Sequence, residues 1–197
     1  MKKVVIALLA IGISPYAFAD KFNGASVSVN GEFSSTTAKV KSDGDTIEGV
    51  GRQSANLDIA ADYAFALNDK FVLLAGGRYA LFDNEIAKYK SDDESAKVKS
   101  KNHYSLFVAP GYKINQDTLA YVKASFESAK GTLSGTDDDQ SRRYNGFAFG
   151  VGLRSYITDQ VFVNVEASRT FYNKESFSGT STDTGTTTAS FGAGYSF

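Results

Sequence analysis

The chain ends on Ser190-Phe191-Gly192-Ala193-Gly194-Tyr195-Ser196-Phe197, and this stretch decides the fold. Its odd-numbered positions are Ala, Tyr or Phe, whereas its even-numbered positions are Ser or Gly. A period of two is the period of a β-strand, whose successive side chains point to opposite faces. The stretch therefore predicts a strand with lipid on its aromatic face and small polar side chains on its inner face.

The same alternation recurs upstream, and residues 55–67 show it most clearly, with apolar side chains at every odd position from Ala55 to Leu67. A soluble sandwich, which also has a wet and a dry face, would show the same pattern. Each predicted strand can supply the about 9–11 tilted residues that span a hydrocarbon layer. The predicted strands are residues 22–34, 52–67, 70–83, 102–115, 118–131, 143–157, 160–173 and 186–197.

The connections favour the membrane alternative. Residues 66–70, 114–118 and 156–160 are tight, turn-forming links, whereas the other four connections are long and polar. Short links at one end and long loops at the other are typical of an outer-membrane barrel. We therefore expect an all-β fold: one eight-stranded antiparallel up-and-down transmembrane β-barrel with short periplasmic turns and long extracellular loops.

The amino end predicts a cleaved signal peptide, residues 1–19. Lys2 and Lys3 precede an apolar run, and Ala17-Phe18-Ala19 offers a small-x-small cleavage site. The run is too short for a membrane-spanning helix, which needs about 20 apolar residues. The chain has no Cys, so neither a lipoprotein anchor nor a disulfide is expected. Residues 20–197 would form the barrel domain with a net charge of about −3 (19 basic against 22 acidic residues), which gives no reason to expect nucleic acid as a partner.

The chain resembles the small eight-stranded outer-membrane barrels, a family that includes outer-membrane proteins A and X, the attachment-invasion proteins and the opacity proteins. The resemblance rests on the signal peptide, the strand and loop rhythm, and the terminal strand. It implies that Ser190, Gly192, Tyr195 and Phe197 form the assembly signal read by the barrel-assembly machinery after transport by periplasmic chaperones. It also implies location in the bacterial outer membrane, contact with its lipid and lipopolysaccharide, and a structural role or adhesion to a host or neighbouring cell through the loops.

Following the alternation inward predicts a luminal charge network of nine side chains. An eight-stranded barrel is just wide enough for side chains to fill, and charges there are costly unless paired. We expect these charged side chains to pair with one another and fill the lumen. The alternative is a narrow path for ions or small solutes. We expect no cofactor or metal. The nine residues are Glu32, Asp58, Asp62, Arg78, Lys113, Lys123, Glu127, Arg154 and Glu166.

A third functional alternative starts from the only histidine. His103 and Ser105 have the His-x-Ser spacing of outer-membrane lipid A deacylases, with Glu127 as a conjectured third member. Leu106 and Val108 take the lipid-facing positions of this strand, which turns His103 and Ser105 towards the lumen or its rim. This geometry disfavours a lipid-modifying enzyme, so we expect no catalytic site.

At Arg169 and after Pro110 the sequence does not decide whether side chains face the lipid or the lumen. Arg169 shares the lipid-facing parity of Val161, roughly 20 Å from the periplasmic end of an apolar band about 25 Å tall, where a guanidinium suits a lipopolysaccharide phosphate. The alternative is a bulge that turns Arg169 inward towards Glu166. Pro110 cannot donate to a ladder, so we expect a bulge there, which could reverse the facing of Tyr112 and Lys113.

Overall fold

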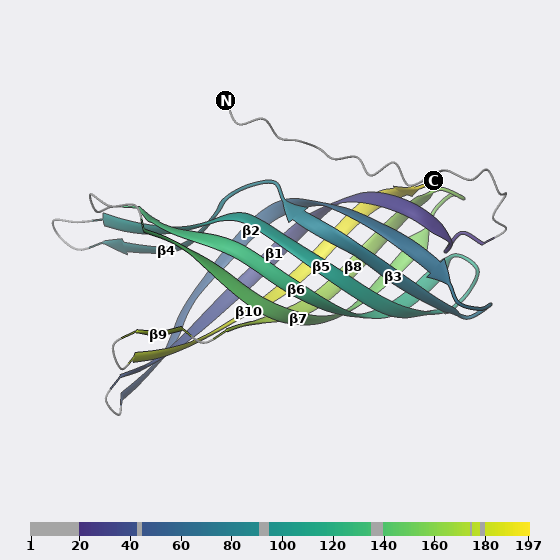
Figure 1. Ribbon diagram of the computed structural model, residues 1–197. Helices are drawn as coiled ribbons and strands as arrows, with labels where there is room; N and C mark the ends of the chain where they lie inside the picture. Colours follow the sequence, from purple (N-terminus) through teal and green to yellow (C-terminus); the bar gives the residue numbers. More distant parts are fainter. Residues whose placement is uncertain (1–19, 43–44, 91–94, 135–139, 174, 178–179) are drawn as a thin grey trace.

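Eight long antiparallel strands close into a barrel, and two short strands extend it at one end (Figure 1). The computed structural model describes residues 20–42, 45–90, 95–134, 140–173, 175–177 and 180–197. The two short strands are β4 (Asn84–Lys90), which pairs with β5, and β9 (Glu175–Phe177), which pairs with β10. The barrel strands are β1 (Gly24–Ser42), β2 (Asp45–Ala66), β3 (Phe71–Ala80), β5 (Ser95–Lys113), β6 (Thr118–Ser134), β7 (Gln140–Tyr156), β8 (Val161–Tyr172) and β10 (Thr180–Ser196).

The first and last barrel strands pair with each other and close the sheet. β1 and β10 are in register over 16 residue pairs, from Ser26 with Ser196 to Lys41 with Ser181. Each of the eight described barrel strands therefore has a neighbour on both sides. Closure satisfies the backbone groups inside the wall, which hydrocarbon cannot do. The predicted eight-stranded barrel is confirmed.

The two faces of the wall match the predicted alternation. On the terminal strand, Phe191, Tyr195 and Phe197 are exposed on the outer wall, whereas Ser190 and Ser196 are buried inside. The other strands follow the same rule, with Val, Leu, Ile and Phe side chains exposed at outward positions. The outer wall is thus a hydrocarbon-compatible surface, and the packed core is the lumen.

The three predicted tight turns all lie at one end of the barrel, and side-chain acceptors fix them. Asn68 Oδ1 accepts from the backbone N–H groups of Lys70 and Phe71, both at 2.9 Å. Asn115 Oδ1 accepts from Asp117 N at 2.9 Å, and Thr158 Oγ1 accepts from Val161 N at 2.9 Å. Because short turns mark the periplasmic side of such barrels, this end is the periplasmic end.

At the opposite end the strands are much longer than predicted. The first outer connection, expected over residues 35–51, is mostly strand, because β1 ends at Ser42 and β2 begins at Asp45. The predicted connections over residues 84–101 and 174–185 likewise contain β4, β9 and parts of β5 and β10. The alternation of apolar and polar residues ends where the membrane ends, but backbone pairing continues, and Thr-rich stretches favour strand.

The predicted bulge at Pro110 is wrong. Pro110 pairs with Leu73 on β3 within an unbroken ladder, and the β5–β6 register is the same on both sides of it. Only one donor towards β6 is missing, and Tyr112 remains exposed while Lys113 points inward. The register of β5 shifts instead between Lys101 and Tyr104, beside Asn102 with φ 52°, a conformation that Asn tolerates.

No helix in the described part of the chain is long and apolar enough to cross a membrane. The predicted signal peptide, residues 1–19, lies outside the described residues.

Candidate functional site

The periplasmic end of the lumen is filled by apolar side chains that the charge pattern did not reveal. Phe22, which precedes β1, is fully buried and meets the Tyr156 ring edge-on with the ring centroids 5.1 Å apart. Leu74, Leu119 and Phe162 are almost completely buried around it. These three residues lie on the inward parity close to the short turns, which is the signal in the sequence that could have located this apolar floor.

Ion pairs hold the segment that carries Phe22 against the periplasmic turns. Lys113, one of the nine predicted luminal charges, pairs with Asp20. Lys21 Nζ lies 2.7 Å from Asp117 Oδ1 and 3.0 Å from Asp159 Oδ1. Hydrogen bonds that the Lys21 ammonium donates to Asp117 and to Asp159 raise its pKa above the usual value. The segment is thus fixed to two of the three turns.

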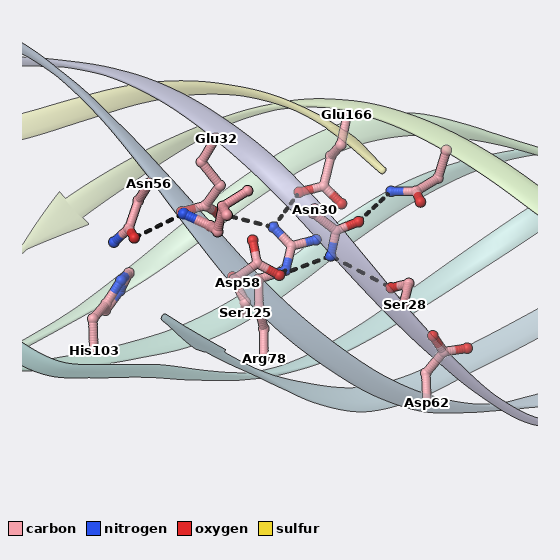
Figure 2. A network of polar contacts seen from close by, with 12 residues as sticks. Ser28, Asn30, Glu32, Asn56, Asp58, Asp62, Arg78, His103, Ser125 and Glu166 are labelled. Carbon is pink, nitrogen blue, oxygen red and sulfur yellow. Dashed lines mark hydrogen bonds and ion pairs between the residues drawn. The ribbon is translucent and has the colours of Figure 1, made fainter. Parts of the chain in front are cut away.

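Arg78 lies at the centre of the polar part of the lumen, among three carboxylates from different strands (Figure 2). Its guanidinium nitrogens are 3.2 Å from Glu32, 3.4 Å from Asp58 and 3.6 Å from Glu166. Asn30 donates to Asp58 Oδ1 at 2.7 Å, which adds a neutral donor to the acidic side. Three acids and one guanidinium would be acidic in excess, so further cations are needed nearby.

Lys123 supplies one such cation, whereas Arg154 is paired with a fourth acid, Asp62. Lys123 pairs with Glu166, which also accepts from the Tyr121 hydroxyl at 3.2 Å. Arg154 binds Asp62 through both terminal nitrogens at 2.9 and 2.8 Å. The Arg154 guanidinium also lies over the Phe162 ring, 4.3 Å from its centroid. The polar network is therefore packed directly on the apolar floor.

Towards the outer end, Glu127 pairs with His103. His103 Nε2 is 3.0 Å from Glu127 Oε2, and the Ser125 hydroxyl donates to Glu127 Oε1 at 2.6 Å. Ser105 is buried, and no hydrogen bond joins it to His103 within the described lumen. A serine nucleophile needs its base as hydrogen-bond partner, whereas here the carboxylate takes that place. The His-x-Ser pair is not assembled as a nucleophile and base.

All nine predicted luminal charges point inward, and each has an ion-pair partner. The sequence analysis coupled His103 with Glu127 only as a conjecture, and it missed Asp20, Asn30 and Tyr121 as partners, because their contacts depend on the tertiary register. Among the residues that the structure describes, no group of three or more His, Asp or Glu is arranged to hold a metal ion. The arrangement can fill and stabilise the barrel.

The closing strand β10 contributes only small side chains to this lumen. Its inward positions from Thr186 to Ser196 are Thr, Ser or Gly. A Cβ added at Gly192 would lie 2.1 Å from Asn30 Oδ1, and one at Gly194 would lie 2.2 Å from the Phe162 ring. Hydroxyl pairs join β10 to β1 further out, Thr188 with Ser34 at 3.1 Å and Thr186 with Thr36 at 3.0 Å.

Arg169 faces outward, so the alternative bulge that would turn it towards Glu166 is wrong. The ladders of β8 with β7 and β10 are unbroken through this position. The guanidinium carbon is 5.6 Å from the centroid of the Phe171 ring, one outward position closer to the outer end. Nη2 lies 3.4 Å from the place that a Cβ of Gly185 would occupy. The side chain therefore extends towards the outer membrane surface, and the contact with lipopolysaccharide remains a prediction.

Comparisons with known proteins agree with this architecture. The family model for the outer membrane protein beta-barrel domain matches residues 4–197. Ail, the attachment invasion locus protein of Yersinia pestis, solved with the heparin analogue sucrose octasulfate, is 19% identical with a TM-score of 0.51, covering 89% of this chain and 99% of that chain.

Two further solved structures are similar at lower identity. Neisserial surface protein A is 15% identical with a TM-score of 0.50, covering 89% of this chain and 100% of that chain. The outer membrane protease OmpT of Escherichia coli is 9% identical with a TM-score of 0.51, covering 93% and 100%. At these identities the likeness shows the fold. No curated protein sequence matches the chain.

Proposed function

Because the chain belongs to the family of outer membrane protein beta-barrel domains and is located in the bacterial outer membrane, we propose that it acts through its outer hairpins, as a structural or adhesive surface protein. The barrel anchors and presents the hairpins. In this proposal its own interior has no transport or catalytic task.

The observation that carries the proposal is the filled lumen. Phe22 is 0% exposed and packs with Leu119 and Phe162, both also 0% exposed, across the periplasmic end. Above this floor each of the predicted luminal charges has an ion-pair partner. Opening a path for ions would require breaking buried pairs, at about 3–5 kcal/mol for each. The hairpins are the part of the protein left to meet a partner.

The hairpin of β4 and β5 is the first candidate for that contact. Lys88, Lys90, Lys97 and Lys99 flank the acidic stretch Asp92-Asp93-Glu94 in its sequence. Backbone register places Lys88 opposite Lys97. Such a lysine-rich hairpin suits a polyanion, and heparin is the appropriate probe because Ail was solved with a heparin analogue.

A loop replacement tests this proposal. One variant has residues 85–99 replaced by a short Gly-Ser turn, and the control has residues 175–183, which contain no Lys or Arg, replaced in the same way. Both should remain heat-modifiable barrels. Loss of binding to heparin and to host cells only in the first variant supports adhesion through this hairpin. Equal binding by both variants would reject adhesion through this hairpin, and binding by neither wild type nor variants would leave only the structural role.

The runner-up function, a narrow channel, is tested by single-channel conductance of the purified barrel in planar bilayers. We expect at most small, rare steps, and stable ion-selective openings would favour the channel instead. The third alternative, a lipid A deacylase, is tested by the mass of lipid A from cells that overproduce the protein. We propose that the protein is not an enzyme, because His103 pairs with Glu127 and no hydrogen bond joins it to Ser105 in the described part of the lumen. An unaltered mass supports this, and loss of an acyl chain would refute it.

Assembly partners are part of the same proposal. The exposed Tyr195 and Phe197 flank the buried Ser196 at the end of β10, as expected of a strand that the barrel-assembly machinery reads.

A further inference from the structure

The outer wall of β6 and β7 changes character abruptly towards the outer end of the barrel. Directly opposite residues on the two strands share a face, so outward positions can be followed as pairs. From the periplasmic side, the pairs are Ala120 with Leu153, Val122 with Val151, Ala124 with Phe149 and Phe126 with Phe147, then Ser128, which is buried by its neighbours, with Asn145, and finally Lys130 with Arg143. Four apolar pairs are thus followed by one polar pair and one doubly cationic pair.

The aromatic pair marks the outer boundary of the hydrocarbon layer. The rings of Phe126 and Phe147 meet edge-on with their centroids 5.7 Å apart. Phe147 is ten residues above the exposed Ile157 at the periplasmic turn, about 33 Å along the strand, which a tilt of about 40° reduces to about 25 Å of height. This equals the height of the apolar band of such barrels.

Lys130 and Arg143 therefore lie at the level of the lipid headgroups. They are four residues beyond the aromatic pair, about 10 Å higher when the tilt is included. Both side chains are exposed. Directly opposite side chains have Cβ atoms about 4.5–5.5 Å apart, and like charges at that spacing repel. No carboxylate of a described residue forms an ion pair with either side chain, so nothing within this part of the protein relieves the repulsion.

We propose that Lys130 and Arg143 together bind a phosphate group of an outer-leaflet glycolipid, in the chemical class of lipid A. The guanidinium provides a planar bidentate donor for the phosphate oxygens, and the ammonium provides a second, compact charge. A phosphate between the two cations converts their repulsion into attraction to a shared anion. This site is independent of what the hairpins bind.

The position on the outer wall favours a lipid over a free ion. The aromatic rings and the apolar pairs directly below offer acyl chains a continuous surface, so one ligand would contact the cations and the apolar wall together. Each cation near an anionic membrane surface contributes about a fivefold gain in affinity. We expect about a fivefold loss of lipid A affinity for Lys130→Gln or Arg143→Gln and about 30-fold for the double variant.

The experiment compares wild type, K130Q, R143Q, the double variant and the control Lys70→Gln, which removes an exposed cation at a periplasmic turn. Each is reconstituted in phosphatidylcholine vesicles alone, with diphosphorylated lipid A, or with dephosphorylated lipid A. Retained lipid A is quantified by mass spectrometry, and stability is measured by urea unfolding. The double variant should lose retention of diphosphorylated lipid A only, while Lys70→Gln should behave as wild type.

The free energy of unfolding distinguishes phosphate binding from a merely structural role of Lys130 and Arg143. With diphosphorylated lipid A, the double variant should be less stable than wild type, because the ligand no longer stabilises it. In phosphatidylcholine it should be equally or more stable, because a repulsive pair has been removed. The proposal would be overturned if the double variant changed the free energy of unfolding in the same direction in both kinds of vesicle. Equal loss of retention with dephosphorylated lipid A, or displacement of lipid A by millimolar inorganic phosphate, would also overturn it.

Discussion

Breaking the ion pair between Arg154 and Asp62 should destabilise the barrel by about 3–5 kcal/mol, because removal of one partner leaves the other as an uncompensated buried charge. The side chains are only 7% and 2% exposed, and two hydrogen bonds of 2.9 and 2.8 Å join them. Loss of two charge-assisted hydrogen bonds, at about 1.5–3 kcal/mol each, gives a similar range. An exposed pair would contribute only about 0–1 kcal/mol.

The assay is a double-mutant cycle with Arg154→Met, Asp62→Asn and the combined variant. The free energy of unfolding is measured by urea titration in lipid vesicles, with the shift of folded protein in gels as readout. The combined variant should cost clearly less than the sum of the two single variants, because it buries no unpaired charge. The control is Lys21→Gln, which removes an exposed pair at the periplasmic turns and should change stability little.

The reasoning would be refuted if each single variant cost less than about 1 kcal/mol and the effects were additive, as expected of screened surface charges. That result would mean that water fills this part of the lumen. It would also remove the main argument against a channel.

Four further predictions concern assembly, conductance and lipid contact. Phe197→Ala, or deletion of Phe197, should reduce folded protein in outer-membrane fractions, and wild-type amounts of both variants would contradict its role in the assembly signal. Neutralising the central cation by Arg78→Gln should increase the small, rare conductance steps expected of wild type, whereas wild-type channels of porin size would contradict a closed lumen. Arg169→Ala should lower co-purification of lipopolysaccharide while thermal unfolding stays unchanged; unaltered co-purification would reject the contact. Gly194→Ala should destabilise the barrel by about 1–3 kcal/mol because its Cβ meets Phe162, and the outward substitution Ala193→Ser, measured by the same urea titration, should cost less.

The sequence predicted the wall of the barrel because the contrast between lipid and lumen imposes a period of two on every strand. Val27 and Val29 are exposed while Ser26 and Ser28 are buried, as their parity required. The contrast ends at the outer membrane boundary, so the extensions of β1 and β2 beyond it left no alternation to detect. There the strands depend on backbone pairing, which the side-chain pattern does not encode.

The sequence predicted which charged side chains face the lumen, but it did not predict which of them pair with one another. Arg154 and Asp62 are 92 residues apart in the chain, and only the register of the closed barrel brings them together. Phe22 was missed because its burial depends on a terminal segment that turns into the lumen instead of following a strand. The bulge predicted at Pro110 was wrong, because one missing donor did not shift the register. The register shift beside Asn102 was not predicted, because nothing in the side-chain pattern indicates it.

The small inner face of β10 has a consequence for the order of events during assembly. β10 is the last strand of the barrel to leave the ribosome, and its partner β1 is the first, so the seam between them joins residues up to 170 positions apart. The bulky and charged luminal groups all come from other strands or from the segment before β1. We expect that they can reach their final arrangement while the sheet is still open at this seam, and that β10 then completes the cylinder without displacing any of them. In the final step of assembly β10 would thus pair with β1 and bring only hydroxyl groups and glycines into the lumen, so no charge has to leave water in that step.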